Sequence, residues 1–369
     1  MPQPPPPPAL PSRPCKTLRS DAGSHLRLSL RRNRSSARRP VESRVEEEIL
    51  KRAKMRLLLA SAALLWLSAA AAETVEVQLQ QGAIVGSRSE AKGGRAFYGF
   101  LGIPFAQPPV GALRFKDPVA AGAWEGVRNG TVAPPLCPQP DAPSDWMQED
   151  CLYLSVFTPQ PNRTDLPVMV WLPQGGFISD ATPLFQPEFL LAKDVVLVVL
   201  QHRLGVLGFL STEDAELPGN LGLKDQAMAL RWVQDNIRDL GGDPDKVTIF
   251  GQNAGGAAVH YHMLSPMSSG LFQRAIMQSG AALCPWALRE DHRQVAFGFG
   301  RMVGCPGERA DAANSTALVD CLRDVPVEQL MAVTPYITVS ERPSGRLIEC
   351  VCVYVHSCVP GSVNGQKET

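Results

Sequence analysis

The amino-acid sequence predicts an α/β fold, with a central, mainly parallel β-sheet and helices on both faces. Two continuous apolar runs, residues 166–172 and 195–200, have the composition of strands that are covered on both sides. A helix is predicted over 223–240, because apolar side chains recur there at spacings of three and four. A β-branched and aromatic run at 246–250 predicts a further strand, and a second helical pattern follows it. This order of strands and helices implies crossover connections between parallel strands.

Residues 1–54 form a basic leader. They contain 13 Lys and Arg residues against 5 Asp and Glu residues, a net charge of +8, and open with a proline run at 4–8. This composition predicts disorder. The remainder of the chain contains 23 basic against 31 acidic residues, a net charge of −8, and has no basic stripe. A nucleic-acid partner is therefore not expected.

Residues 55–72 have the three parts of a secretory signal peptide. Arg56 precedes sixteen apolar or small residues, 57–72, which end in a run of alanines. Cleavage before Glu73 would release a secreted protein. In one interpretation Met55 is the true first residue, and the leader 1–54 is upstream sequence that was wrongly included. The alternative is a type II membrane anchor, although sixteen residues are slightly fewer than the ~17–25 that span a bilayer. A membrane is expected as a partner only if this segment is retained.

Two further signals frame the domain that follows. Short alternating strands are predicted at 75–86, at its start. Gly241 and Gly242 end the predicted long helix, because glycine most readily adopts the left-handed conformation of a helix cap. The chain shows no internal repeat, and α/β proteins of this length commonly form one unit. We therefore expect one large domain.

The segment 251–255 has the spacing of the G-x-S-x-G nucleophile elbow, but Asn253 stands where the motif has serine. A strand–turn–helix of this kind lifts its central side chain clear of the sheet. A serine hydroxyl in that place can be deprotonated by histidine and attack an ester carbonyl. A carboxamide cannot, because its nitrogen lone pair is delocalised. No catalytic residue is therefore predicted in this chain.

Several long motifs occur in order along the chain, at 98–115, 149–154, 203–210, 219–226 and 243–251. Together they resemble one family, the type-B carboxylesterases and cholinesterases. These are secreted α/β-hydrolases with a Ser–Glu/Asp–His triad, and the resemblance implies an α/β-hydrolase domain over 73–335. The tail 336–369 does not match, and the triad acid and histidine of the family fall beyond residue 369. We therefore expect the C-terminal part of the fold to be missing.

The resemblance also assigns the oxyanion hole. The family's H-G-G-G-F reads Pro173-Gln-Gly-Gly-Phe177 here, so the backbone N–H groups of Gly175, Gly176 and Ala254 take the oxyanion positions. Pro173 has no N–H group and fixes its own φ. The donor pocket is expected either to be lost or to survive as a weak site for an anion or carbonyl.

Cysteines and sequons agree with an extracellular protein. The resemblance pairs Cys137 with Cys151 and Cys305 with Cys321, the alternative being four free buried thiols. Cys284 has no evident partner and is interpreted as a core residue. Three N-x-[ST] sequons predict glycosylation, at Asn129, Asn162 and Asn314.

No cofactor or metal is expected. His260 and His262 lie two residues apart and so do not share a helical face. They are interpreted as ordinary helix residues, and His202 as structural. The sequence contains no H-E-x-x-H motif and no phosphate-binding loop.

Two main functions remain open. The first is a non-catalytic secreted glycoprotein that acts by binding or adhesion, since the resembling family includes adhesion proteins without a working triad. Its partner would be an extracellular protein or a hydrophobic ester. The alternative is a carboxylic ester hydrolase acting on small or xenobiotic esters, whose sequence here comes from a truncated or incorrectly assembled gene. In that case Phe177 and Trp286 either line an acyl pocket or are ordinary core aromatics. A product without stable function is the third possibility.

Overall fold

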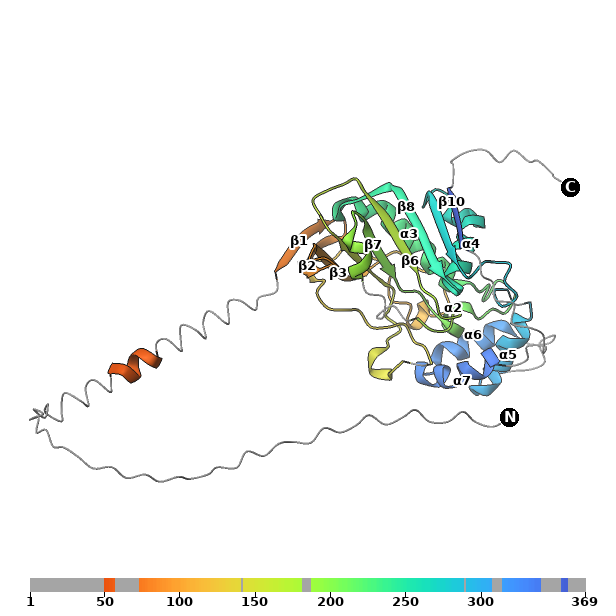
Figure 1. Cartoon of the computed structure of the whole chain (residues 1–369). Helices are drawn as coiled ribbons and strands as arrows, with labels where there is room; N and C mark the ends of the chain where they lie inside the picture. The colour runs from red at the N-terminus through yellow and green to blue at the C-terminus, as the bar shows by residue number, and fades with distance from the viewer. Residues whose placement is uncertain are drawn as a thin grey trace, which may run out of the picture. The chain divides into compact units, whose positions relative to one another are not determined.

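The computed structural model describes residues 50–56, 73–140, 142–180, 187–288, 290–306, 314–339 and 353–357. The chain divides into two units, 1–71 and 72–369. The described part of the first unit is a short helix at 50–56, and the second unit holds the sheet (Figure 1). The signal segment 57–72 lies outside the described residues, as do most of the leader 1–54 and of the tail 336–369.

The described strands form one mixed sheet of ten. The four strands β7, β6, β8 and β9 pair in parallel and carry the predicted elbow, while β1, β2, β3 and β5 extend the sheet antiparallel to one side. The predicted α/β-hydrolase fold is thus confirmed. The strands in sheet order are β1 (Thr74–Leu79), β2 (Gly82–Glu90), β3 (Ala96–Pro104), β5 (Tyr153–Thr158), β7 (Val196–Leu200), β6 (Leu166–Leu172), β8 (Gly242–Gln252), β9 (Arg274–Gln278) and β10 (Val353–Ser357), with β4 (Val127–Asn129) beside β2.

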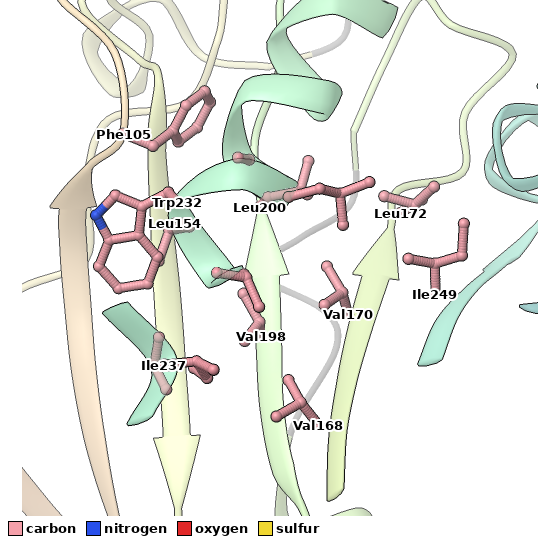
Figure 2. Packing of buried hydrophobic residues seen from close by; sticks show 14 of the residues in the cluster. Phe105, Leu154, Val168, Val170, Leu172, Val198, Leu200, Trp232, Ile237 and Ile249 are labelled. Atoms are coloured by element: carbon pink, nitrogen blue, oxygen red, sulfur yellow. The ribbon is translucent and has the colours of Figure 1, made fainter. Parts of the chain in front are cut away.

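The parallel strands are buried on both faces, as their continuous apolar sequence predicts. All five positions of β7 are buried. Val198 packs in the main core beneath the helices, whereas its neighbour Val199 points to a second cluster on the opposite face. Figure 2 shows side chains of β6, β7 and β8 packed with Trp232 and Ile237 of the long helical segment. The short 3-10 helix η4 (Pro187–Ala192) contributes Leu191 to the cluster on the other face.

The predicted helix 223–240 is α3 (Leu221–Asn236), continued by the 3-10 helix η5 (Ile237–Leu240). Gly241, with φ of 94°, ends it in the predicted left-handed conformation. A buried ion pair ties α3 to the end of β7. Arg203 donates from Nε and Nη2 to the carboxylate of Asp225 at 2.9 and 2.7 Å, and from its backbone N at 3.0 Å.

A separate group of helices packs around its own apolar cluster, and Figure 1 shows α5, α6 and α7 gathered together. Arg114 joins this group to the N-terminal half. Its guanidinium pairs with Glu149 and donates to the carbonyls of Leu322, Arg323 and Val325 at the end of α6. The helices are α2 (Gly205–Phe209), α4 (Ala254–Leu264), α5 (His292–Met302), α6 (Ser315–Asp324) and α7 (Val327–Val339), with the 3-10 helices η1 (Gly111–Leu113), η2 (Ser144–Trp146) and η6 (Pro266–Ser268).

Both predicted disulfides are present. Cys137 bonds to Cys151, and Cys305 to Cys321. Cys284 is free and buried, as expected for a core residue. The interpretation of the paired cysteines as four free thiols is therefore wrong.

One segment of the tail adds to the sheet. Residues of β10 pair antiparallel with β9, from Val353 opposite Gln278 to Ser357 opposite Arg274. The backbone groups on this side of β9 are thereby hydrogen-bonded. In the described part of the chain, no helix has the length and apolar character needed to cross a membrane.

Candidate functional site

The candidate site is the turn between β8 and α4, and it has the predicted strand–turn–helix form. Asn253 occupies the turn with φ of 54° and ψ of −117°, and α4 begins at the next residue. Few L-residues adopt a positive φ, and asparagine is one that tolerates it. The backbone around it is hydrogen-bonded. Asn253 N donates to the carbonyl of Gln278 at 2.9 Å, and Ala257 N donates to the carbonyl of Asn253 at 3.0 Å.

Close backbone contacts explain two glycines, one in the elbow and one just after β9. A Cβ atom on Gly255 would lie 2.2 Å from the carbonyl oxygen of Leu172, at the end of β6. A Cβ on Gly280 would lie 2.0 Å from the carbonyl oxygen of Asn253. Both distances are shorter than any van der Waals contact, so only glycine fits. The turn is therefore enclosed between the ends of β6 and β9.

The side chain of Asn253 hydrogen-bonds within the turn. Its Oδ1 accepts a hydrogen bond from the backbone N of Ala254 at 2.8 Å. This N–H group holds one of the three oxyanion positions that the family resemblance assigns, beside those of Gly175 and Gly176. In the structure the Ala254 donor already has an acceptor within the turn. The physical reason is that a carboxamide carries an acceptor oxygen within reach of the next backbone N–H.

The oxyanion loop keeps its glycine-rich turn. Gly175 and Gly176 have φ of 111° and 65°, and the carbonyl of Gly175 accepts from the backbone N of Ile178 and of Ser179, each at 3.0 Å. Phe177 also has a positive φ, and its ring packs against Phe209 with centroids 4.9 Å apart. This packing holds the loop in place.

The buried histidines have structural surroundings. His262 is buried on α4, with Nε2 2.9 Å from Gln226 Oε1 and Nδ1 2.7 Å from Ser268 Oγ. Burial lowers the pKa of His262 to about 4. His202 is also buried, with its ring edge-on to Phe209 at 6.3 Å. Burial, and then the charge of His262, lower the pKa of His202 to about 3.

No histidine in the described ranges hydrogen-bonds to Asn253. His260 Nδ1 instead accepts from the backbone N of Ala282 at 3.2 Å. The described residues also hold no group of three or more His, Cys, Asp or Glu side chains that could bind a metal ion. The turn thus presents a carboxamide and a glycine-rich loop, and neither supplies a nucleophile or a base.

The three sequon asparagines are accessible. Asn129, Asn162 and Asn314 are all exposed. Asn314 caps α6, with Oδ1 accepting from the backbone N of Ala317 at 3.2 Å. Asn129 Oδ1 accepts from Thr131 N at 3.0 Å and from Thr131 Oγ1 at 2.7 Å. Glycosylation itself stays a prediction.

Comparison with known proteins agrees with the α/β-hydrolase fold. The model of the carboxylesterase family matches residues 73–356, and so extends beyond residue 335, the expected end of the domain. Acylcarnitine hydrolase of Mus musculus is 45% identical over 270 residues, which cover 68% of this chain and 47% of that protein. Juvenile hormone esterase of Tribolium castaneum is 43% identical over 287 residues, 72% and 48% of the two chains. Esterase FE4 of Myzus persicae is 44% identical over 274 residues, again 72% and 48%. The chain spans about half the length of these relatives, and it belongs to the carboxylesterase family.

Proposed function

We propose that the protein is a non-catalytic member of the carboxylesterase family that acts by binding. The hydrogen bond from Ala254 N to Asn253 Oδ1 is the observation that carries this proposal. It places a carboxamide, which is not a nucleophile, at the tip of the elbow. It also engages a backbone donor that acyl transfer needs for the oxyanion.

The proposed setting is extracellular. Two disulfides and three exposed sequons support a secreted glycoprotein, because disulfides persist in oxidising compartments. The proposed partner is an extracellular protein, or a hydrophobic ester that binds without being hydrolysed. The type II membrane anchor is the alternative, and it applies only if residues 57–72 are retained.

An active carboxylic ester hydrolase, for small or xenobiotic esters, is the second candidate. The relatives favour it, since acylcarnitine hydrolase and juvenile hormone esterase are named for hydrolysis. This candidate requires a nucleophile, and position 253 of the sequence is asparagine.

The test compares the unmodified protein with Asn253→Ser and Asn253→Ala. Hydrolysis of p-nitrophenyl acetate and labelling by a fluorophosphonate probe are measured for each. We expect no turnover and no labelling in any of the three, because no histidine of the described chain reaches position 253. Turnover by the unmodified protein would overturn the proposal. Activity gained by Asn253→Ser alone would show that a base is present and would favour the second candidate.

A peptide map of the native protein tests the setting. We expect a mature N-terminus near Glu73, asparagine at position 253 and glycans on the sequons. A retained segment 57–72 would instead support the membrane anchor. Serine at position 253 in the native protein would make it an ordinary esterase.

A further inference from the structure

A cavity of about 490 Å³ lies beside α3, on a different part of the domain from the elbow. Its lining comes from one side of α3, from Gln80 and Gln81 in the turn after β1, and from a loop within 117–123. Sites for small molecules commonly have volumes of ~300–1,000 Å³. None of the residues of the elbow or of the oxyanion loop lines this cavity. It is therefore separate from the candidate site described above.

The uncharged part of the lining is mostly apolar. Phe105 and Trp232 belong to the main core and contribute to it, and Figure 2 shows their side chains close to each other. Met228 on α3 and the half-exposed Met267 also line the cavity. Methionine side chains adapt to irregular apolar shapes. Such a lining favours the apolar body of a ligand.

Four charged side chains also line the cavity, and two of them are already paired. Lys224 forms an ion pair with Asp117. Arg231 and Asp235 are both exposed, and neither forms an ion pair or a side-chain hydrogen bond with any described residue. The cavity therefore offers a ligand one open positive group and one open negative group.

The spacing of these two open groups is set by the helix. Arg231 and Asp235 lie four residues apart on α3, and Cβ atoms at this separation are ~5–6 Å apart. Pairing between the two stabilises a helix less when the base precedes the acid, as it does here. Their charged ends can instead contact an ammonium group and a carboxylate group that share one carbon atom. Complementary charges on both sides favour such a zwitterion over an ion of a single charge.

We propose that this cavity binds a free α-amino acid with a large apolar side chain. The carboxylate of the ligand pairs with Arg231, its ammonium group pairs with Asp235, and its side chain packs against Trp232 and Met228. This site is independent of the binding function proposed for the elbow.

The test compares L-phenylalanine with two analogues that keep its ring. The first is 3-phenylpropionate, which lacks the ammonium group, and the second is 2-phenylethylamine, which lacks the carboxylate. Binding of each to the full-length protein at pH 7 is measured by ligand-observed NMR titration. We expect L-phenylalanine to bind about two- to fivefold more tightly than either analogue, the size of effect that one exposed ion pair gives.

Two variants test the charged contacts separately. Arg231→Gln should weaken L-phenylalanine and 3-phenylpropionate by about two- to fivefold and should not weaken 2-phenylethylamine, which has no carboxylate. Asp235→Asn should weaken L-phenylalanine and 2-phenylethylamine by a similar factor and should not weaken 3-phenylpropionate. The matched controls are Arg238→Gln and Asp239→Asn, because both residues are exposed in η5 and lie outside the lining. These controls should leave all three affinities unchanged.

A further pair of variants locates the site without changing a charge. Ala123 is exposed and lines the cavity, so Ala123→Trp should fill the space and weaken all three ligands at least ~10-fold. Ala133 is exposed and lies outside the lining, so Ala133→Trp is the control and should have no effect. The proposal is overturned if L-phenylalanine does not bind, if it binds no more tightly than its analogues, if the charge controls weaken it as much as Arg231→Gln and Asp235→Asn, or if Ala123→Trp has no effect.

Discussion

Acidification should destabilise this protein through its two buried histidines. His202 and His262 are enclosed in the domain, and burial lowers the pKa of each, to about 3 and about 4. In the unfolded chain both rings take the ordinary value of 6.5. Below pH 6.5 the unfolded chain therefore binds protons that the folded protein does not bind. Folding stability is complete above pH 6.5 and falls as the pH decreases toward the folded pKa values.

The size of the loss follows from the pKa differences. Each pH unit between the folded and unfolded pKa values costs about 1.4 kcal/mol for each histidine. Between pH 7 and pH 4.5 this amounts to roughly 2–3 kcal/mol for each ring, and about 5 kcal/mol for both. A domain of ordinary stability has ~5–15 kcal/mol in total. The protein should therefore be close to unfolding at pH 4.5.

Urea unfolding followed by tryptophan fluorescence at pH 7, 6, 5 and 4.5 measures this loss. His202→Phe keeps an aromatic ring beside Phe209 and removes one titrating group, so its loss over this range should be smaller by about 2–3 kcal/mol. The control is His292→Gln, in the first turn of α5, where the side chain is only partly buried. This variant should lose as much stability as the unmodified protein. An equal loss in His202→Phe and the unmodified protein would refute the reasoning.

Three further predictions concern stability and modification. Asp225→Asn should lower the free energy of unfolding by about 3–5 kcal/mol, because it leaves the guanidinium of Arg203 buried without its anion; urea unfolding at pH 7 measures it. Replacing Cys305 and Cys321 by serine should cost ~3 kcal/mol, the usual effect of a disulfide that closes a loop of this length, and reduction of this bond in the unmodified protein should match it. Peptide N-glycosidase treatment of the native protein should lower its mass and convert the glycosylated sequon asparagines to aspartate; an unchanged mass would contradict glycosylation.

The central part of the fold follows directly from the sequence. The runs 166–172 and 195–200 are strands with the predicted limits, or within one residue of them, because strands covered on both faces need uninterrupted apolar sequence. The helix after them was also predictable from its three-and-four spacing. It begins two residues before the predicted start, at Leu221, and its last turn is a 3-10 helix at Ile237–Leu240. Helix ends commonly tighten in this way.

Other elements depend on contacts between distant residues. The helix α5 contains Gly298 and Gly300, and glycine inside a helix costs about 1 kcal/mol relative to alanine. It is helical because Phe297 and Phe299 are buried and Gly300 lets α6 approach closely: a Cβ there would lie 2.3 Å from Leu318 Cδ1. The pairing of β10 with β9 is likewise not local. Neither the helix α5 nor the pairing of β10 with β9 could be predicted from the sequence pattern alone.

The candidate site was only partly predictable. The elbow, with asparagine in the place of serine, could be predicted from the spacing of 251–255. Its glycines are conspicuous in the sequence because close backbone contacts leave no room for a side chain at Gly251 and Gly255. The hydrogen bond from Ala254 to Asn253 could not be predicted, because it depends on the side-chain rotamer. The cavity of about 490 Å³ beside α3 was not predicted either. Its α3 residues are spaced like one side of any amphipathic helix, and the rest of its lining comes from distant segments, including Gln80, Gln81 and a loop within 117–123.

Asparagine at the tip of the elbow has a consequence for stability that variants at position 253 can measure. Asn253 holds a backbone conformation that costs of order 1–3 kcal/mol for most residues, and its side chain offsets part of this cost by bonding to Ala254. Asn253→Ala loses this bond and keeps the conformation, so it should destabilise the protein by about 1 kcal/mol. Asn253→Gly also loses the bond but adopts positive φ freely, so it should be more stable than the alanine variant by about 1 kcal/mol or more. Equal stabilities of the two variants would mean that the turn is unstrained, and that asparagine does not stabilise the elbow it occupies.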